Sequence, residues 1–318
     1  MARLSVALAA CALLAAAGVQ GGEPRPWYDE GHGYVTEQAQ DLARWMDSFF
    51  GDLRADEEAP RSILRLRLEE EWDERDGFGA DIKGRGKFYL PNLDKRVSLL
   101  LDEDDTGETE TEDLLLEDEE NLDDLSLQLE AIREERHRLD LRVGLRSSGY
   151  PKTSARYRYR HPFRADLWGT ASQELFYLTD DGFASETRLE LDHLLAADRL
   201  LQWHNRLYWV EDKPGVKWAT SLALQRRLGG DRALSAFASA VGRTEPTNLV
   251  RDYAVGLRFR RKLFRPWLFG EIKPYYRWSK AESGIARENA LVVLLRLEVV
   301  FSKDGEKGAP PAEEAEEL

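Results

Sequence analysis

The sequence has 318 residues, of which 42% are hydrophobic and 33% charged, and its formal net charge is −14. After residue 20, no stretch is apolar for the roughly eighteen residues that a membrane-spanning helix needs, which excludes such a helix there. The acidic balance argues against nucleic acid as a partner, because a surface that binds phosphates must be basic. A negative mean hydropathy is compatible with a membrane barrel, because only alternate residues of its strands face lipid.

Residues 1–21 are predicted to be a cleaved secretory signal peptide. Arg3 gives a short positive start, residues 4–17 form an apolar run, and small residues follow that suit a cleavage site. A polar segment with two prolines comes next, at 22–26, which favours a signal over a buried helix. The only cysteine is Cys11. We interpret it as an ordinary residue of the signal peptide rather than as a lipid-modified cysteine. Removing the signal would leave no thiol for a disulfide or a metal.

Residues 22–60 are predicted to form a periplasmic segment with one amphipathic helix, over 35–50. Apolar residues recur there at spacings of three and four, and Gly51 and Pro60 mark its end. We expect this helix to pack on the end of the main domain. The alternatives are a plug inside a lumen and a docking helix for a periplasmic partner.

From residue 61 the apolar period changes to two, which is typical of strands with one apolar face. Leu64, Leu66 and Leu68, for example, alternate with charged residues. We expect fourteen strands, with twelve as the alternative, in a closed antiparallel all-β transmembrane barrel over residues 61–301. Their predicted ranges are 61–72, 77–90, 95–103, 124–133, 137–147, 153–163, 166–178, 183–194, 199–211, 215–228, 232–244, 250–263, 267–280 and 287–301.

An even number of strands places both ends of the barrel domain on one side of the membrane, which is the periplasm in bacterial outer-membrane barrels. The longest connection, an acidic segment over 102–124, then falls on the outer side, where we expect a solvated loop. Weak binding of divalent cations is the alternative for it. The third strand is short. In the eleventh, small residues alternate from Ala233 to Val241, so its faces stay unassigned.

Two features favour a membrane barrel over a soluble sandwich. The predicted strands run to about ten residues or more, enough to cross a bilayer at a tilt, whereas soluble strands average nearer five or six. Aromatic residues also gather towards strand ends on the apolar face, as in the girdles of membrane barrels. The residues predicted for this girdle, with the closing strand's last residue, are Tyr157, Tyr159, Trp203, Trp209, Trp218, Tyr276, Trp278 and Phe301.

The last predicted strand, Ala290 to Phe301, alternates apolar residues and ends on an aromatic. It resembles the C-terminal signature of bacterial outer-membrane barrel proteins, and the resemblance implies that the barrel-assembly machinery reads this strand. The chain departs from that signature in continuing beyond Phe301. We expect the tail, 302–318, to be a disordered acidic periplasmic segment.

The other face of each strand is densely charged. An Arg or Lys facing hydrocarbon at the bilayer midplane costs roughly 2–4 kcal/mol, so these side chains are expected to line the lumen. Either a water-filled pore favours anions, or cross-strand ion pairs close the lumen. Three like charges on one strand, Arg156, Arg158 and Arg160, favour the first. The predicted lumen residues are Arg65, Arg67, Lys83, Arg85, Arg138, Arg142, Arg156, Arg158, Arg160, Arg206, Arg258, Arg260, Arg277 and Arg296.

We predict no catalytic residue, no cofactor and no metal site. Of the five histidines, only His204 falls mid-strand on the lumen face, and no serine stands at a recognisable hydrolase spacing from it. The sequence thus predicts an outer-membrane channel or transporter for anionic or polar solutes, exported by its signal peptide. The alternatives are a structural or assembly barrel with a closed lumen and periplasmic partners, and a lipid-modifying barrel enzyme. The oligomeric state stays open.

Overall fold

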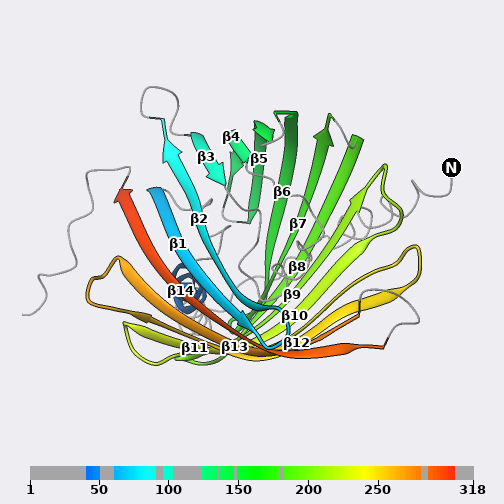
Figure 1. Cartoon of the computed structure of the whole chain (residues 1–318). Helices are drawn as coiled ribbons and strands as arrows, with labels where there is room; N and C mark the ends of the chain where they lie inside the picture. The colour runs from blue at the N-terminus through cyan, green and yellow to red at the C-terminus, as the bar shows by residue number, and fades with distance from the viewer. Residues whose placement is uncertain are drawn as a thin grey trace, which may run out of the picture.

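The chain folds into one closed antiparallel barrel of fourteen strands, which confirms the predicted fold class (Figure 1). A computed structural model describes residues 41–50, 61–90, 96–102, 124–134, 136–146, 149–179, 182–280 and 286–304. The strands are β1 (Arg61–Asp73), β2 (Gly77–Tyr89), β3 (Val97–Asp102), β4 (Asp124–Arg133), β5 (His137–Arg146), β6 (Pro151–Arg164), β7 (Leu167–Leu178), β8 (Gly182–Ala196), β9 (Arg199–Val210), β10 (Lys217–Arg227), β11 (Arg232–Arg243), β12 (Leu249–Lys262), β13 (Leu268–Ser279) and β14 (Glu288–Asp304).

The barrel closes where β14 pairs with β1, in a register that runs from Arg61 opposite Asp304 to Asp73 opposite Val292. β1 therefore begins where β14 ends, and we call this end of the barrel the terminal end and the opposite one the far end. Even-numbered strands reach the next strand at the terminal end through short turns, such as 197–198 between β8 and β9. This is the end that the sequence predicts to be periplasmic.

The two faces of the wall differ as period-two alternation requires. On β1, Leu66 is 43% exposed and Leu68 40%, whereas Arg67 between them is only 6% exposed. Apolar residues thus point outward and charged ones inward, as a lipid-embedded barrel demands. On β11, whose faces the sequence left unassigned, Ala233 and Ser235 are fully buried on the inward side.

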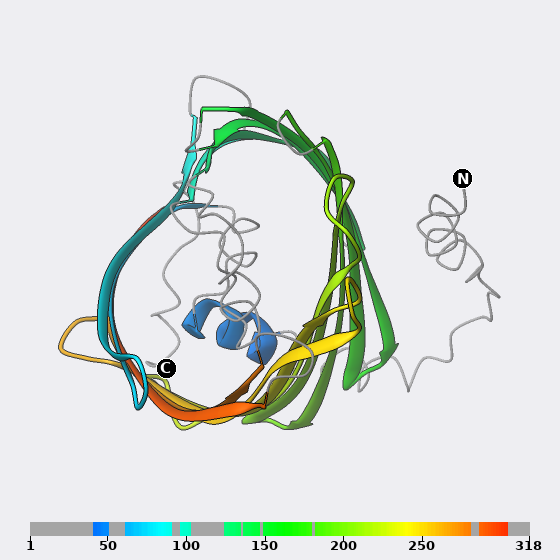
Figure 2. The same cartoon turned by 45° about the vertical axis from the view of Figure 1, so that its right-hand side comes forward.

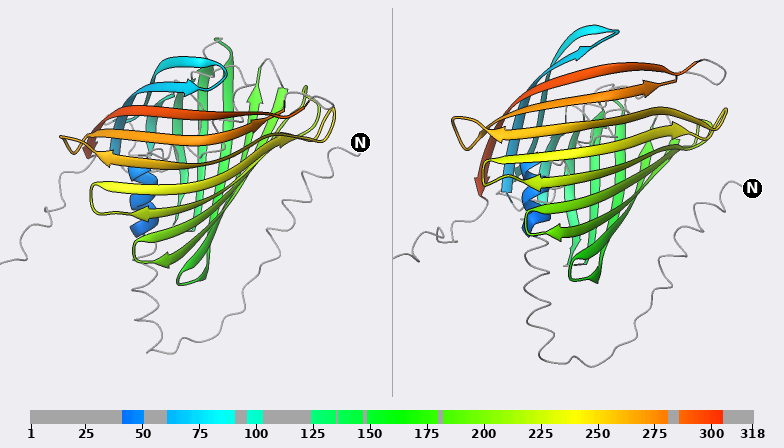
Figure 3. Two further views of the ribbon diagram at one scale, coloured as in Figure 1. Left: turned by 60° about the horizontal axis from the view of Figure 1, so that its bottom comes forward. Right: turned by 90° about the horizontal axis from the view of Figure 1, so that it is seen from below.

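A helix over residues 41–50 lies inside the barrel (Figures 2 and 3). Among the described residues, no helix is long and apolar enough to cross a bilayer. We expected the helix to pack on the end of the barrel. It lies inside the lumen instead, because its apolar face packs against apolar residues on the inward side of the strands. The predicted signal peptide, most of 22–60, the predicted acidic loop and the tail beyond Asp304 fall outside the described residues.

Candidate functional site

An apolar cluster fixes the helix in the lumen near the terminal end. Met46 on the helix is completely buried, and the Phe49 ring meets the Phe269 ring edge-on, with 5.6 Å between centroids. Burying one such side chain is worth about 1.5–3 kcal/mol, so several together hold a helix that is too short to be stable alone. The cluster joins Leu42, Ala43, Met46, Phe49 and Phe50 of the helix to Trp168, Leu200, Ala233 and Phe269 of the wall; we call these four wall residues the helix seat.

Cations of the wall cover the aromatic rings of the helix. The Arg258 guanidinium lies 4.6 Å from the centroid of the Phe50 ring, and Arg227 lies 5.1 Å from that of Trp45. Cation–π contacts of this kind contribute about 0.5–2 kcal/mol, more where they are shielded from water. The inward cations next to the helix therefore stabilise its position in the lumen.

The C-terminal turn of the helix is bound by two arginines. Arg65 donates to the carbonyl oxygen of Ser48 at 3.2 Å, and Arg258 donates to that of Phe50 at 3.0 Å. The last carbonyls of a helix lack partners within it and carry the negative end of its dipole, so cations are favoured there. Two arginines from opposite sides of the closing seam thus fix the end of the helix.

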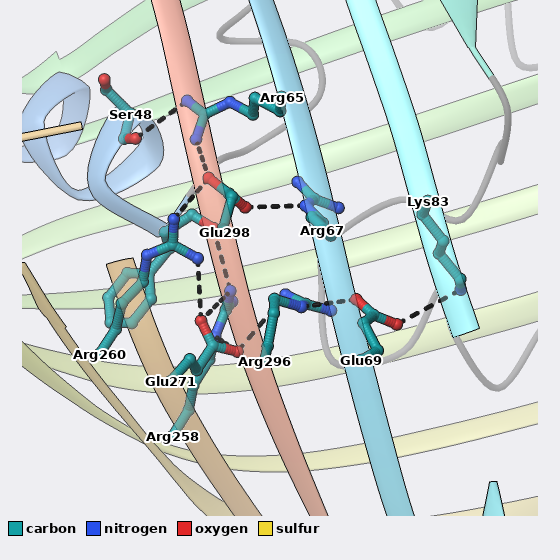
Figure 4. A network of polar contacts seen from close by, with 11 residues as sticks. Ser48, Arg65, Arg67, Glu69, Lys83, Arg258, Arg260, Glu271, Arg296 and Glu298 are labelled. Carbon is teal, nitrogen blue, oxygen red and sulfur yellow. Dashed lines mark hydrogen bonds and ion pairs between the residues drawn. The ribbon is translucent and has the colours of Figure 1, made fainter. Parts of the chain in front are cut away.

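These two arginines belong to a buried ion-pair network across β1, β2, β12, β13 and β14, shown in Figure 4. Glu298 accepts from Arg65 at 2.6 Å, from Arg67 at 2.8 Å and from Arg260 at 2.7 Å. Glu271 pairs with Arg258, Arg260 and Arg296 at 2.8, 3.1 and 3.4 Å. We call this set the seam network: Arg65, Arg67, Glu69, Lys83, Arg258, Arg260, Glu271, Arg296 and Glu298.

The seam network closes one side of the lumen. The side chains of Arg260 and Glu298 are both 0% exposed, and that of Glu271 is 1% exposed. At its edge, Arg296 binds Glu69 at 2.6 Å and Lys83 lies 3.5 Å from the same carboxylate. Buried ion pairs gain little net stability, but removing one partner leaves a buried charge that is costly. Loss of one of these partners is therefore expected to destabilise this part of the wall.

The inward face of β5 and β6 is strongly basic. By alternation it carries Arg138, Arg142, Arg146, Lys152, Arg156, Arg158 and Arg160, against one carboxylate of these strands, Asp140. We call these seven cations the arginine wall. Carboxylates of the neighbouring strands compensate part of the charge: Arg138 lies 2.9 Å from Glu130 and Arg156 lies 3.9 Å from Glu174. The helix contacts β1 and β7–β14, whereas the strands of the arginine wall lie across the lumen from β14 in Figure 2.

The remaining predicted lumen residues also lie on the inward face. Arg206 is buried and pairs with Glu186 at 2.6 Å. Near the far end, Arg277 lies 2.9 Å from Asp73. Arg85 is 7% exposed on β2. Lys262, which the sequence did not single out, lies 5.9 Å from the centroid of the Phe49 ring, so its role depends on where the helix lies.

The predicted girdle residues divide between the two ends of the outer surface. Trp209, Trp218, Tyr276 and Trp278 stand on the far-end parts of β9, β10 and β13. Trp203, Tyr159 and Phe301 lie towards the terminal end, and Tyr157 is nearer the middle of β6. The exposed fractions of Trp203 and Phe301 are 48% and 53%. The Tyr157 hydroxyl is 2.6 Å from Nδ1 of His137, so this tyrosine has a polar partner on the outer face.

The register also brings together three residues that sequence spacing did not reveal. Glu190 on β8 stands opposite His204 on β9, which stands opposite Ser221 on β10. These three residue types match those of a hydrolase triad. Within the part of the chain that the structure describes, no group of three or more His, Cys, Asp or Glu could hold a metal ion.

A closed register with an apolar outward face, aromatic residues towards both ends and a charged interior defines a bacterial outer-membrane β-barrel. No family model and no curated protein matches the chain. Solved structures with similar folds include the KdgM porin, 8% identical, covering 74% of this chain and 99% of that one, with a TM-score of 0.36.

Two further solved structures are similar in fold. OmpT, an outer membrane protein of Vibrio cholerae, is 13% identical over 76% of this chain and 96% of that one, with a TM-score of 0.46. OccK11 (OpdR) of Pseudomonas aeruginosa is 10% identical over 76% and 96%, with a TM-score of 0.45. The class of this chain rests on its own register and side-chain distribution.

Proposed function

We propose that the protein is an outer-membrane channel or transporter whose basic lumen favours anionic or polar solutes. The observation that carries the proposal is the arginine wall, whose strands lie across the lumen from β14 and from the helix end that Arg65 binds. A fourteen-strand barrel is wide enough for a passage unless it is plugged. Cations along such a passage attract anions and repel small cations, so the solute preference follows from the charge.

The helix is proposed to narrow this passage at its terminal end. It covers β7–β14 and β1 through the helix seat and the seam network, while β5 and β6 keep their cations on the other side. Solutes would therefore pass along the arginine wall, and the helix would set the width of the opening. Cation–π contacts and helix-end hydrogen bonds, rather than a covalent link, hold the helix in place.

Conductance of the full chain in planar bilayers, under a salt gradient, tests this proposal. We expect a reversal potential that indicates anion preference. In Arg156→Gln/Arg158→Gln, we expect a smaller reversal potential, because the lumen then has two fewer cations. Arg164→Gln is the matched control, because Arg164 is 60% exposed at a turn of the terminal end. An unchanged reversal potential in the double variant, or cation preference in the native protein, would contradict the proposal.

A structural or assembly role is the second candidate, and the seam network favours it. A wall that holds several ion pairs at 0–10% side-chain exposure provides rigidity that transport alone does not require. This role would use the helix or the closing strand to engage periplasmic proteins, including the assembly machinery. A folded barrel without conductance, even after Met46→Ala/Phe49→Ala loosens the helix, would support it. A photocrosslinker at Trp45 would then capture another protein rather than the barrel's own strands.

A further inference from the structure

Four arginines stand in two directly opposed pairs at the terminal end of the wall. Arg199 on β9 is opposite Arg226 on β10, and Arg232 on β11 is opposite Arg261 on β12. Opposed side chains of neighbouring strands have their Cβ atoms about 4.5–5.5 Å apart, and like charges there are destabilising. Two such pairs on four consecutive strands therefore favour an anion beside them.

All four side chains point outward, because the residue next to each one along its strand points into the lumen. Leu200 and Ala233 belong to the helix seat, which places Arg199 and Arg232 on the opposite face. Arg227 and Lys262 lie over helix rings, so Arg226 and Arg261 also face outward. The four arginines, which we call the outer arginine patch, thus belong to the lipid side of the wall.

The protein compensates only part of this charge. Asp198 binds Arg226 at 2.9 Å and lies 3.6 Å from Arg199, and Asp231 lies 3.4 Å from Arg232. These carboxylates are 38% and 48% exposed. Arg261 is exposed and forms no ion pair within the described part of the chain. Two carboxylates against four guanidinium groups leave an excess of two positive charges.

Apolar residues border the outer arginine patch on the side towards the membrane centre. Two residues further along each strand, on the same face, stand Leu201, Leu224, Leu234 and Phe259. Leu228 and Leu263, two residues beyond Arg226 and Arg261, are also 38% exposed. The patch therefore lies close to the terminal edge of the apolar outer surface, within reach of lipid phosphates. Water can hydrate these arginines but brings no negative charge. A phosphate brings that charge and can accept hydrogen bonds from two guanidinium groups at once.

We propose that the outer arginine patch binds the headgroups of anionic phospholipids in the leaflet at the terminal end of the barrel. Each phosphate would lie between two opposed arginines, with its acyl chains along Leu224 and its neighbours. The site differs from the lumen in ligand and in face, so it does not depend on whether the barrel conducts. It predicts a preference for net negative lipids over zwitterionic ones.

Native mass spectrometry of the full chain in detergent, with equimolar phosphatidylglycerol and phosphatidylethanolamine added, tests the site. We expect preferential retention of phosphatidylglycerol, and a loss of about five-fold for each charge removed in Arg226→Gln/Arg261→Gln. The lysine variant of the same two positions should keep part of the preference, because it keeps charge but not the paired donors. Heat-modifiable gel mobility verifies that each variant is folded.

Two further variants make the result specific. Arg75→Gln removes an exposed arginine at the far end, where Arg75 pairs with Glu288 at 2.8 Å, and should leave retention unchanged. Asp198→Asn releases two arginines of the patch and should raise retention, which a purely structural ion pair would not do. The proposal would be overturned if the native protein retained both lipids equally, or if Arg226→Gln/Arg261→Gln retained as much phosphatidylglycerol as the native protein. It would also be overturned if inorganic phosphate, at the same concentration as the lipid, displaced phosphatidylglycerol.

Discussion

Arg65 and Glu298 are 233 residues apart in the sequence, yet Nη1 of the first lies 2.6 Å from Oε1 of the second. Arg65 belongs to the first strand and Glu298 to the last, so their ion pair crosses the seam that closes the barrel. Arg65 also donates to the helix. One residue thus links the closure of the wall to the position of the helix.

Glu298→Gln should destabilise the barrel by roughly 3–5 kcal/mol, because the neutral amide leaves Arg65, Arg67 and Arg260 without their shared buried carboxylate. Equilibrium unfolding by urea in lipid vesicles measures the effect. Asp231→Asn is the control: its ion pair is about half exposed, so its loss should cost no more than about 1 kcal/mol. Equal unfolding midpoints for the two variants would show that the seam network is not structural.

A reversible crosslink between helix and wall should lower conductance. The rings of Phe49 and Phe269 face each other edge-on, and the only native cysteine lies in the predicted signal peptide. Cysteines cannot span the space of two rings by a direct disulfide, so Phe49→Cys/Phe269→Cys is joined with a bis-maleimide that contains a reducible bond. The crosslinked variant should conduct less before reduction than after it, because the link prevents the helix from leaving its seat. Each single-cysteine variant serves as control, and identical conductance before and after reduction would mean that helix movement does not limit the passage.

Retention of anionic lipid should not change between neutral pH and about pH 5. A hydrogen bond from Arg226 lowers the pKa of the Asp198 carboxyl below its usual value. Because the pKa is lowered, the carboxylate stays ionised between neutral pH and about pH 5. Its ion pair with Arg226 is lost only when the pH falls below that interval. The charge of the outer arginine patch is then constant over this interval. A marked rise in retention towards pH 5, measured with the same lipid pair, would contradict this.

His204→Ala and Ser221→Ala should each leave the membrane lipid profile of an overexpressing strain unchanged. Although the register places these residues side by side, the row faces the lumen, where bilayer lipids do not reach. Mass spectrometry of total lipids measures the outcome, with the native chain as reference. If the native chain alters the profile and either variant does not, the row is catalytic and the lipid-modifying alternative is correct.

Strand number and the closed fold follow from the sequence because period-two alternation is a local property. Leu66 and Arg67 differ so much in polarity that the face of β1 is determined without any knowledge of its neighbours. On β11 this signal is missing, because Ala, Ser and Gly are compatible with either face. Contact of Ala233 with the helix determines the inward side there, and no local pattern contains that contact.

Pairing between strands is the part that sequence could not supply. Each residue of the Arg199–Arg226 pair is unremarkable in its own segment, and only the register makes them neighbours. The same holds for His204 and Ser221. A change of one residue in register would separate these pairs and move one member to the other face. The candidate sites therefore required the three-dimensional register, whereas the fold required only the pattern.

The position of the helix also constrains the order of assembly. Its contacts on the wall come from the first strand and from strands as late as β14, although it precedes all of them in the chain. Glu298, which orients Arg65 and Arg260 beside the helix, is supplied only when the closing strand arrives. A chain that stops before β14 therefore has all four residues of the helix seat but lacks the carboxylate that orients Arg65 and Arg260 beside the helix. The final arrangement of charges around the helix thus depends on closure of the barrel.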